Sequence, residues 1–230
     1  MTASGTENGR FRIPPIHPEG VKFVVMSAIV VALLHLVLGW MSPWIGVTLW
    51  LIPVAVYLFF RDPERVPPQD EAAIVSPADG TVCMIAEAPM PAELKAPVTE
   101  AVWRVSIFMS VFNVHVNRAP AAGKITATHY VQGLFINASL DKASEQNERK
   151  MYLMETSHGK TLAFVQIAGL VARRIVSFVE EGAAVGRAQR FGLIRFGSRV
   201  DVYLPLGVRP NVLVGQTMIA GETVLARNEN

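Results

Sequence analysis

A glycine followed directly by a serine, Gly197 and Ser198, lies in a run of alternating apolar residues near the end of the chain. The alternation of Ile194, Val200 and Val202 with other residues predicts a strand around the pair. The hydroxyl of such a serine can attack the glycine carbonyl and convert the peptide bond into an ester. β-Elimination would then cut the chain, and hydrolysis of the resulting dehydroalanine would leave an N-terminal pyruvoyl group. Most Gly-Ser pairs are ordinary turns, so this chemistry needs support from other residues.

Two further side chains are candidates for proton transfer. His115 lies in the apolar run 111–116, which predicts a strand. An imidazole titrates near neutral pH, so it suits general acid–base chemistry, although a buried histidine with a structural partner is the commoner use. Asp79 directly precedes Gly80, a pair that is also typical of a simple turn. The remaining histidine candidates are weaker: His129 and His158.

A long apolar segment near the N-terminus determines where in the cell these residues act. Residues 23–60 contain no Asp, Glu, Lys or Arg, and a single membrane span needs about 20 apolar residues. A Ser-Pro break near the centre predicts two helices, 21–41 and 44–60, in a tight hairpin. Basic residues flank both ends, so the ends and the following domain are expected on the cytoplasmic side of the cell membrane. A shallow insertion in one leaflet is the alternative.

The rest of the 230-residue chain is expected to be mainly β. Short apolar runs separated by turn residues predict strands at 80–87, 102–112, 123–131, 151–156, 161–168, 174–179, 191–196, 199–204, 211–214 and 223–226. We therefore expect a mainly β (α+β) fold with hairpins like those of lipoyl domains, preceded by the hydrophobic helical hairpin. The predicted organisation is a polar tail (1–20), the membrane hairpin (21–60), a linker (61–73) and a β-rich domain (74–230).

Composition narrows the classes of function. The single cysteine, Cys83, excludes an internal disulfide, and no metal-binding spacing of His and Cys occurs, so no metal site is expected. A formal net charge of +2 does not favour a nucleic-acid partner, and it suits a chain bound to anionic lipid. A serine hydrolase is disfavoured because the chain lacks the Gly-x-Ser-x-Gly elbow.

Several segments in order resemble one family, the short form of the phosphatidylserine decarboxylase proenzymes. The resemblance extends from about residue 60 to 225. The segments that carry it are Ser-Pro-Ala-Asp-Gly at 76–80, Phe-Asn-Val-His-Val-Asn-Arg-Ala-Pro at 112–120, Asn-Ala-Ser-Leu-Asp-Lys-Ala-Ser at 137–144 with Asn-Glu-Arg at 147–149, residues 166–175, and Phe-Gly-Ser-Arg-Val-Asp at 196–201.

The resemblance implies self-cleavage between Gly197 and Ser198 into chains 1–197 and 198–230, which stay associated because the strands beside the cut share a sheet. It implies a covalent pyruvoyl cofactor made from Ser198. A Schiff base between that ketone and the amine of phosphatidylserine would allow decarboxylation to phosphatidylethanolamine. His115 aligns with the histidine linked to protonation of the substrate carbon, and Asp79 with the aspartate of the self-cleavage set.

The sequence departs from the longer members of the family at one position. Arg118 stands where they have a second histidine, so the general base for self-cleavage is left open between His115 and Asp79 acting through another group. Arg118, Arg173 and Arg174 are candidates for binding the lipid phosphate and carboxylate, since a guanidinium matches such oxyanions.

Two alternative functions remain at this point. One is a pyruvoyl decarboxylase of a related headgroup, such as an archaetidylserine-like lipid. Another is a non-enzymatic, membrane-tethered carrier of lipoyl type, modified at Lys142. The sequence is also compatible with a homo-oligomer.

Overall fold

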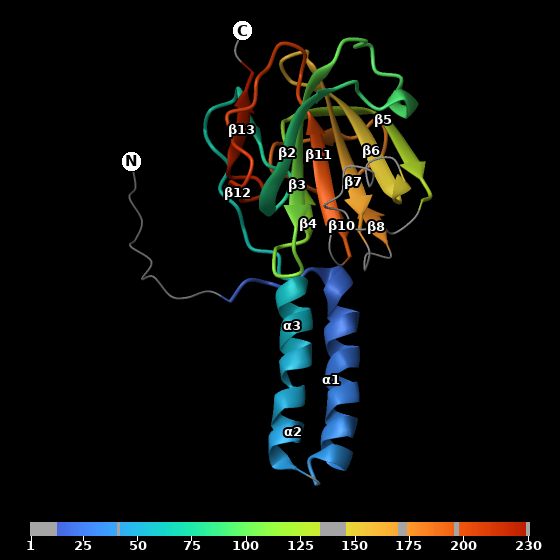
Figure 1. Cartoon of the computed structure of the whole chain (residues 1–230), viewed down its shortest axis with the longest axis vertical. Helices are drawn as coiled ribbons and strands as arrows, with labels where there is room; N and C mark the ends of the chain where they lie inside the picture. The colour runs from blue at the N-terminus through green and yellow to red at the C-terminus, as the bar shows by residue number, and fades with distance from the viewer. Residues whose placement is uncertain (1–12, 41, 134–145, 170–173, 196–197, 229–230) are drawn as a thin grey trace. The chain divides into compact units, whose positions relative to one another are not determined.

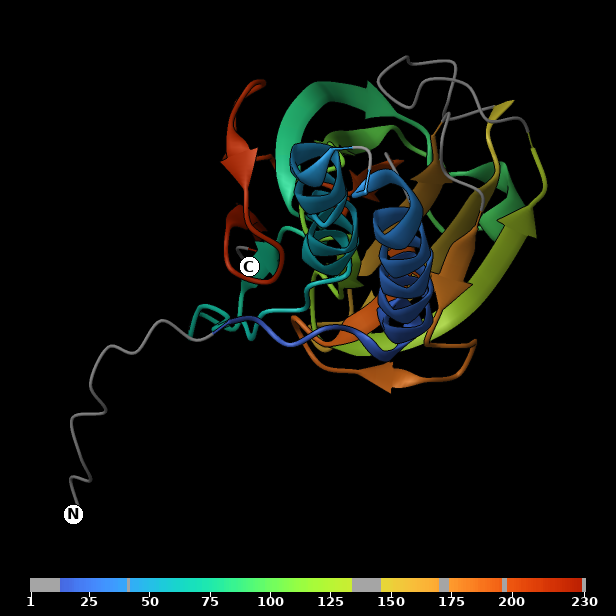
Figure 2. The ribbon, with the colours of Figure 1, turned by 90° about the horizontal axis from the view of Figure 1, so that it is seen from below.

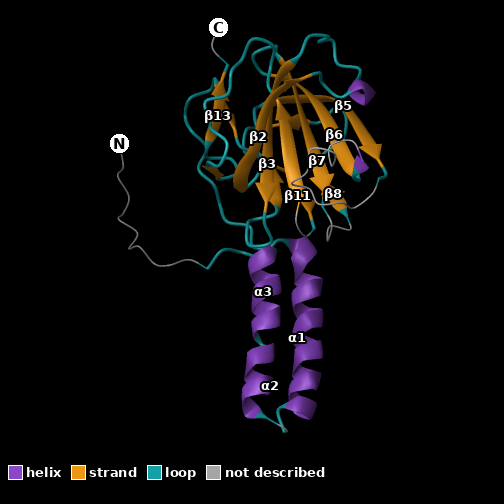
Figure 3. Ribbon diagram, viewed as in Figure 1, coloured by secondary structure: helices purple, strands orange, loops and turns teal. Residues whose placement is uncertain are grey.

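The computed structural model describes residues 13–40, 42–133, 146–169, 174–195 and 198–228. The chain forms two units, residues 1–64 and 65–230, of which the first is helical and the second is built of strands (Figure 1, Figure 3). The expected mainly β fold preceded by apolar helices is therefore confirmed. Gly197, Arg173 and Lys142 lie outside the described residues.

The helical unit is a hairpin. Helix α1 (Pro18–Leu38) is followed by two shorter helices, α2 (Pro43–Leu49) and α3 (Leu51–Phe59), both of which pack on it. By length and composition, α1 is able to cross a membrane; α2 and α3 together form a shorter apolar segment. The prediction of a continuous helix over 44–60 is wrong, because the helix is interrupted at Trp50. Pro53 has no N–H to bond to the Leu49 carbonyl and its ring crowds that carbonyl, so the helix is interrupted one turn earlier.

The β unit holds an antiparallel sheet of eight strands among the described residues, in the order β12-β2-β3-β11-β7-β6-β5-β9. It is strongly curled (Figure 2). Its strands are β2 (Gly80–Ala88), β3 (Val102–Met109), β5 (Gly123–Val131), β6 (Arg149–Thr156), β7 (Thr161–Ala168), β9 (Ala184–Val185), β11 (Ser198–Tyr203) and β12 (Thr217–Met218).

Two small sheets complete the unit. One has the order β4-β10-β8 and the other pairs β1 with β13. Their strands are β1 (Ala73–Val75), β4 (Val116–Arg118), β8 (Ile175–Ser177), β10 (Arg190–Ile194) and β13 (Val224–Arg227), and a short 3-10 turn, η1 (Ala92–Leu94), follows β2.

The main core lies on one face of the curled sheet, where alternate residues of its strands point inward. Stacked and edge-on aromatic rings at its centre join the large sheet to β10: Tyr152 and Phe164 stack at 5.0 Å, and both meet Phe191 edge-on. All six residues of β11 are buried. Burial on both faces fits a strand in the middle of the sheet, and this strand begins with Ser198.

Two of the predicted strands are wrong. Residues 111–116 form a turn and a short extended segment, because the side chain of Asn113 accepts hydrogen bonds from the N–H and the hydroxyl of Ser110, both at 2.8 Å, and closes a turn. Residues 211–214 lead into a second turn, in which the Gln216 side chain accepts from the N–H of Leu213 at 3.1 Å. Both segments contain the apolar residues of a strand pattern, but side-chain hydrogen bonds to the backbone override that pattern.

Candidate active site

Ser198 is the first residue of β11, the central strand. It pairs with Met109 at the end of β3 and with Ala168 at the end of β7. The residue is fully buried, and its Oγ makes no hydrogen bond within the described part of the chain. An unsatisfied buried hydroxyl costs free energy, about 1–3 kcal/mol, so it calls for an explanation. A hydroxyl kept for reaction with the preceding carbonyl is such an explanation.

Asp79 lies at the same end of the sheet, immediately before β2. Gly80 makes this possible, because a Cβ atom there would collide with the carbonyl oxygen of Phe108, the residue before Met109. The carboxylate of Asp79 is held from two sides. Arg65 donates to both of its oxygens, at 3.0 and 2.8 Å, and the N–H of Ala220 donates to Oδ1 at 2.8 Å. The aspartate is thus fixed in direction by charge-assisted hydrogen bonds.

His115 immediately precedes β4 and is fully buried. Its Nδ1 lies 2.9 Å from the carbonyl oxygen of Asn113. A carbonyl oxygen can only accept a hydrogen bond, so Nδ1 carries the proton in this contact. In the neutral ring, Nε2 is then the nitrogen without a proton and the one that can accept one. The His115 carbonyl accepts from the N–H of Ile194, the last residue of β10, at 3.4 Å. The histidine is therefore tied to the segment that leads into Ser198.

A buried chain of polar side chains connects the two sheets beside this site. The Tyr152 hydroxyl donates to Gln166 Oε1 at 2.9 Å, and Gln166 Nε2 donates to Asn117 Oδ1 at 2.8 Å. Asn117 is the second residue after His115. Gln166 lies two residues before Ala168 on β7, so it shares a face of that strand with the partner of Ser198. Burial raises the pKa of Tyr152, which keeps the hydroxyl protonated as a donor. The chain of bonds fixes β4 against β7.

An ion pair lies on the opposite face of β11. Arg199 and Asp201 are both buried, and the guanidinium contacts the two carboxylate oxygens at 2.8 and 3.0 Å. On that face a cavity of about 530 Å³ extends under η1, with Asp201, Arg104 and Arg149 in its wall. Arg149 is paired with Glu93 at 3.0 Å. The charges in this wall are largely balanced, and the side chain of Ser198 belongs to the other face.

The predicted phosphate-binding arginines are placed differently from one another. Arg118 is buried in β4 and donates to the carbonyl of Ala188 at 3.1 Å, which gives it a structural contact. Arg174 is exposed just before β8, and its carbonyl accepts from the N–H of Arg195 at 3.2 Å. Of the two, Arg174 is the one whose side chain reaches solvent near the end of β10.

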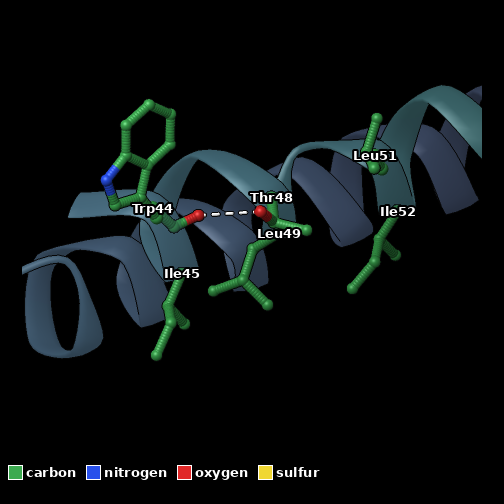
Figure 4. Close-up of a pocket in the computed structure, with 6 residues that line it drawn as sticks. All are labelled: Trp44, Ile45, Thr48, Leu49, Leu51 and Ile52. Carbon is green, nitrogen blue, oxygen red and sulfur yellow. Dashed lines mark hydrogen bonds between the residues drawn. The ribbon is translucent and has the colours of Figure 1, made fainter. Parts of the chain in front are cut away.

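Another hollow belongs to the helical unit. Figure 4 shows it on α2 and α3, lined by Trp44, Ile45, Thr48, Leu49, Leu51 and Ile52. Its one hydroxyl, on Thr48, donates to the carbonyl of Trp44 at 2.7 Å. This lining offers no acid, base or charge. Among the described residues of both units, no group of three or more His, Cys, Asp and Glu side chains could hold a metal ion.

Comparison with known proteins shows the family to which the chain belongs. The model of the family described as phosphatidylserine decarboxylase matches residues 54–226. The chain belongs to the phosphatidylserine decarboxylase family. The matched range contains Asp79, His115 and Ser198.

Relatives extend the match over nearly the whole chain. The phosphatidylserine decarboxylase proenzyme of Ruegeria pomeroyi is 58% identical over 217 residues, covering 93% of this chain and 95% of that protein. The proenzyme of Zymomonas mobilis is 49% identical over 231 residues, covering 97% and 91%. That of Novosphingobium aromaticivorans is 52% identical over 225 residues, covering 93% and 86%. The relatives carry the name of proenzymes, so the family resemblance drawn from the motifs is confirmed.

Sequence reasoning missed two residues of this region. Arg65 was counted only among the basic residues that flank the apolar segment, yet it holds Asp79. Gln166 was noted only as part of a family-like segment, and its role in joining the sheets depends on contacts with Asn117 and Tyr152 that are distant in sequence. An isolated glutamine in an apolar strand, which must find a hydrogen-bond partner when buried, was the available signal.

Proposed function

We propose that this chain is a carboxy-lyase that converts phosphatidylserine to phosphatidylethanolamine, using a pyruvoyl group derived from Ser198. Membership of the phosphatidylserine decarboxylase family supports the reaction. The observation that carries the assignment to this residue is the position of Ser198, which follows Gly197 in the sequence and begins the central strand with a buried hydroxyl that makes no hydrogen bond in the described chain.

The residues fit the formation of such a group. Ser198 supplies the oxygen that attacks the carbonyl of Gly197 and forms an ester. Loss of the Ser198 Cα proton and cleavage of its Cβ–O bond release the carboxyl end of chain 1–197 and leave a dehydroalanine, whose imine tautomer takes up water and loses ammonia to give the ketone. Strand pairing on both sides of β11 holds the new terminus in place after the cut. The pyruvoyl ketone supplies an electron sink for loss of the substrate carboxylate.

His115 and Asp79 complete the proposed set. We assign His115 as the proton donor to the substrate carbon, since its Nδ1 faces the Asn113 carbonyl and Nε2 is therefore the ring nitrogen that can gain and lose a proton. Asp79 takes part in self-cleavage, held by Arg65 and the Ala220 N–H. Arg174 is the better placed of the described arginines to meet a lipid phosphate, because Arg118 is engaged inside the fold.

The helical unit provides the attachment to the membrane. A diacyl lipid stays in the bilayer, so an enzyme that acts on its headgroup gains from being anchored there, and α1 is apolar and long enough to serve. With basic residues on both flanks of the apolar segment, the β unit is assigned to the cytoplasmic side.

Replacement of the nucleophile tests the proposal directly. In Ser198→Ala, we expect one intact chain and complete loss of phosphatidylserine decarboxylation, because no hydroxyl remains to attack the peptide bond. Mass spectrometry of the wild type should give two chains, the smaller with a carbonyl terminus that reacts with hydroxylamine. Normal cutting of Ser198→Ala at position 197 would refute the assignment.

A substitution of His115 separates the two steps. His115→Ala should decarboxylate phosphatidylserine at least about 100-fold more slowly, which is the usual contribution of a positioned acid. The measurement is carbon dioxide release per pyruvoyl group, with the pyruvoyl content counted by carbonyl labelling. Wild-type turnover per pyruvoyl group would remove His115 from the reaction.

A further inference from the structure

An exposed aromatic side chain lies on the turn between the Ser198 end of β3 and His115. The turn is closed by an N–H to carbonyl hydrogen bond from Asn113 to Ser110 at 3.0 Å, and the Asn113 side chain locks it from the other side. Val111 and Phe112 occupy its two central positions. Their exposed fractions are 47% and 83%. The turn thus presents two apolar side chains with large exposed fractions.

Other residues at this end of the β unit share a chemical character. Tyr130, near the end of β5, is 51% exposed. Arg174, which is exposed, and Arg195, which is half-buried, are joined through their backbones where β8 begins and β10 ends. We call Val111, Phe112, Tyr130, Arg174 and Arg195 the docking surface. Apolar tips, an aromatic hydroxyl and cations are the combination that binds at the boundary of an anionic bilayer.

The topology places all five residues at the same end of the large sheet as Ser198. Met109 pairs with Ser198, and the turn begins one residue after Met109. The partner of Tyr130 on β6 is Lys150, and Lys150 is paired with Gln166 on β7, two residues from the partner of Ser198. Arg195 precedes Ser198 by three residues.

We propose that the docking surface binds the surface of an anionic bilayer, with Phe112 inserted among the lipid headgroups. The proposal rests on the proposed function, because a decarboxylase of phosphatidylserine must meet its substrate in a membrane that carries negative charge. The lengths agree. Phe112 is the third residue after Met109, so at most about 11 Å of extended chain separates them. An interfacial apolar residue sits about 5–10 Å deep, so insertion of Phe112 brings Ser198 to the level of the headgroups.

The chain offers a control at the other end of the same strand. Leu206 follows β11 at its far end, in a turn with Gly207, and is 49% exposed. It is apolar and on a turn like Phe112, yet the length of β11, six residues or about 20 Å, separates it from Ser198. A bilayer that binds the docking surface leaves Leu206 in water.

Spin labelling measures the depth of both positions. Cys83 is the one cysteine, so a Cys83→Ser background accepts a nitroxide label at Phe112→Cys or Leu206→Cys in the full-length chain. The sample is placed in nanodiscs of phosphatidylcholine and phosphatidylglycerol, an anionic lipid that is not the substrate. We expect the label at Phe112 to be relaxed more by oxygen than by a water-soluble nickel chelate, and the label at Leu206 to show the reverse. Equal exposure of the two labels to the nickel chelate would overturn the proposal.

A kinetic comparison tests whether docking delivers the substrate. Phe112→Ser should lower kcat/KM on phosphatidylserine vesicles about fivefold or more, while kcat/KM on a short-chain, water-soluble phosphatidylserine changes less than twofold. Leu206→Ser should match the wild type on both substrates. Equal losses on vesicles and on the soluble lipid would contradict docking. If the proposed function failed, the wild type would be uncut and inactive on both substrates, whereas the label depths would still report on the surface.

Discussion

Asp79 shows how a single side chain at this site is controlled by residues far away in sequence. Its partners are Arg65, which belongs to the segment that follows the apolar helices, and Ala220, near the end of the chain. The Arg65 and Asp79 side chains are each 13% exposed, so the pair is largely but not completely shielded from water. A shielded, two-point contact fixes direction as well as charge.

Replacement of Arg65 should slow self-cleavage. A hydrogen bond to a charged group contributes about 1.5–3 kcal/mol when buried, and this pair is partly solvated, so we expect Arg65→Ala to be cut about tenfold more slowly. Arg65→Lys, which keeps the charge but not the planar guanidinium that places Nη2 beside both carboxylate oxygens, should fall between. The rate is measured by pulse-chase in cell-free translation.

A chemical rescue and a control variant distinguish the positioning of Asp79 by Arg65 from a general loss of protein stability. Added guanidinium ion should partly restore cutting of Arg65→Ala, because it can occupy the same place beside Asp79. Arg227→Ala provides the matched control, since Arg227 pairs with Asp70 at 3.0 Å, close to the 2.8 Å of the Arg65 pair, but with side chains 51% and 41% exposed. If self-cleavage of Arg227→Ala were also slow, the effect of Arg65→Ala would reflect a general loss of folding stability and not the positioning of Asp79.

Residue types and order were enough to find Ser198, His115 and Asp79 as candidates, because each belongs to a local motif. Arg65 could not be found in this way. Fourteen residues separate it from Asp79, and an arginine after an apolar helix has a ready explanation as a membrane flank. Only the folded chain shows that it has turned toward the site.

At the scale of elements, β4 and β7 are joined by the side chains of Asn117, Gln166 and Tyr152. Close packing at Gly192 helps the arrangement, since a Cβ atom there would lie 2.7 Å from Gln166 Nε2. The joint matters because β4 follows His115 and β7 flanks Ser198. A loosened joint would change the separation of the two residues.

We therefore expect Gln166→Leu to destabilise the β unit. The substitution preserves volume but removes the donor to Asn117 and the acceptor for Tyr152, at about 1–3 kcal/mol for each buried group left unsatisfied. For a chain of this length, that predicts a fall in Tm of roughly 5 °C or more, measured by differential scanning fluorimetry. Adding Tyr152→Phe should recover part of the loss, because the second unsatisfied group is removed as well. A double variant whose loss of stability exceeds the sum of the losses in the two single variants would contradict this account.

Helices and strands could be predicted where a clear pattern of apolar residues extends over six or more positions. The strands that became β2, β5 and β7 follow from alternating or continuous apolar runs. The three-residue β4 was missed, since its neighbours set it in place and its own sequence is too short for a period. The strand expected at 211–214 and the unbroken helix 44–60 failed for local reasons, a side-chain turn and the proline at 53.

At the scale of the whole molecule, the proposed cut divides the large sheet between two chains. Residues 198–230 supply β11 in its middle, β12 at its edge and β13 in a small sheet. β11 is paired residue for residue with β3 and with β7, from Ser198 to Tyr203 on both sides. The cut precedes the first of these pairs, so it removes none of them. The fragments share a buried core that includes Val200 and Val202.

This arrangement predicts that the processed enzyme behaves as one folded body. With an affinity tag at the C-terminus, chain 1–197 should copurify with chain 198–230 in equal amounts under native conditions, and it should separate in about 6 M guanidinium chloride. The uncut Ser198→Ala chain should unfold within a few degrees of the processed pair, because the same strands are paired in both. Elution of chain 198–230 alone from a native column would mean that pairing on both sides of β11 does not survive the break.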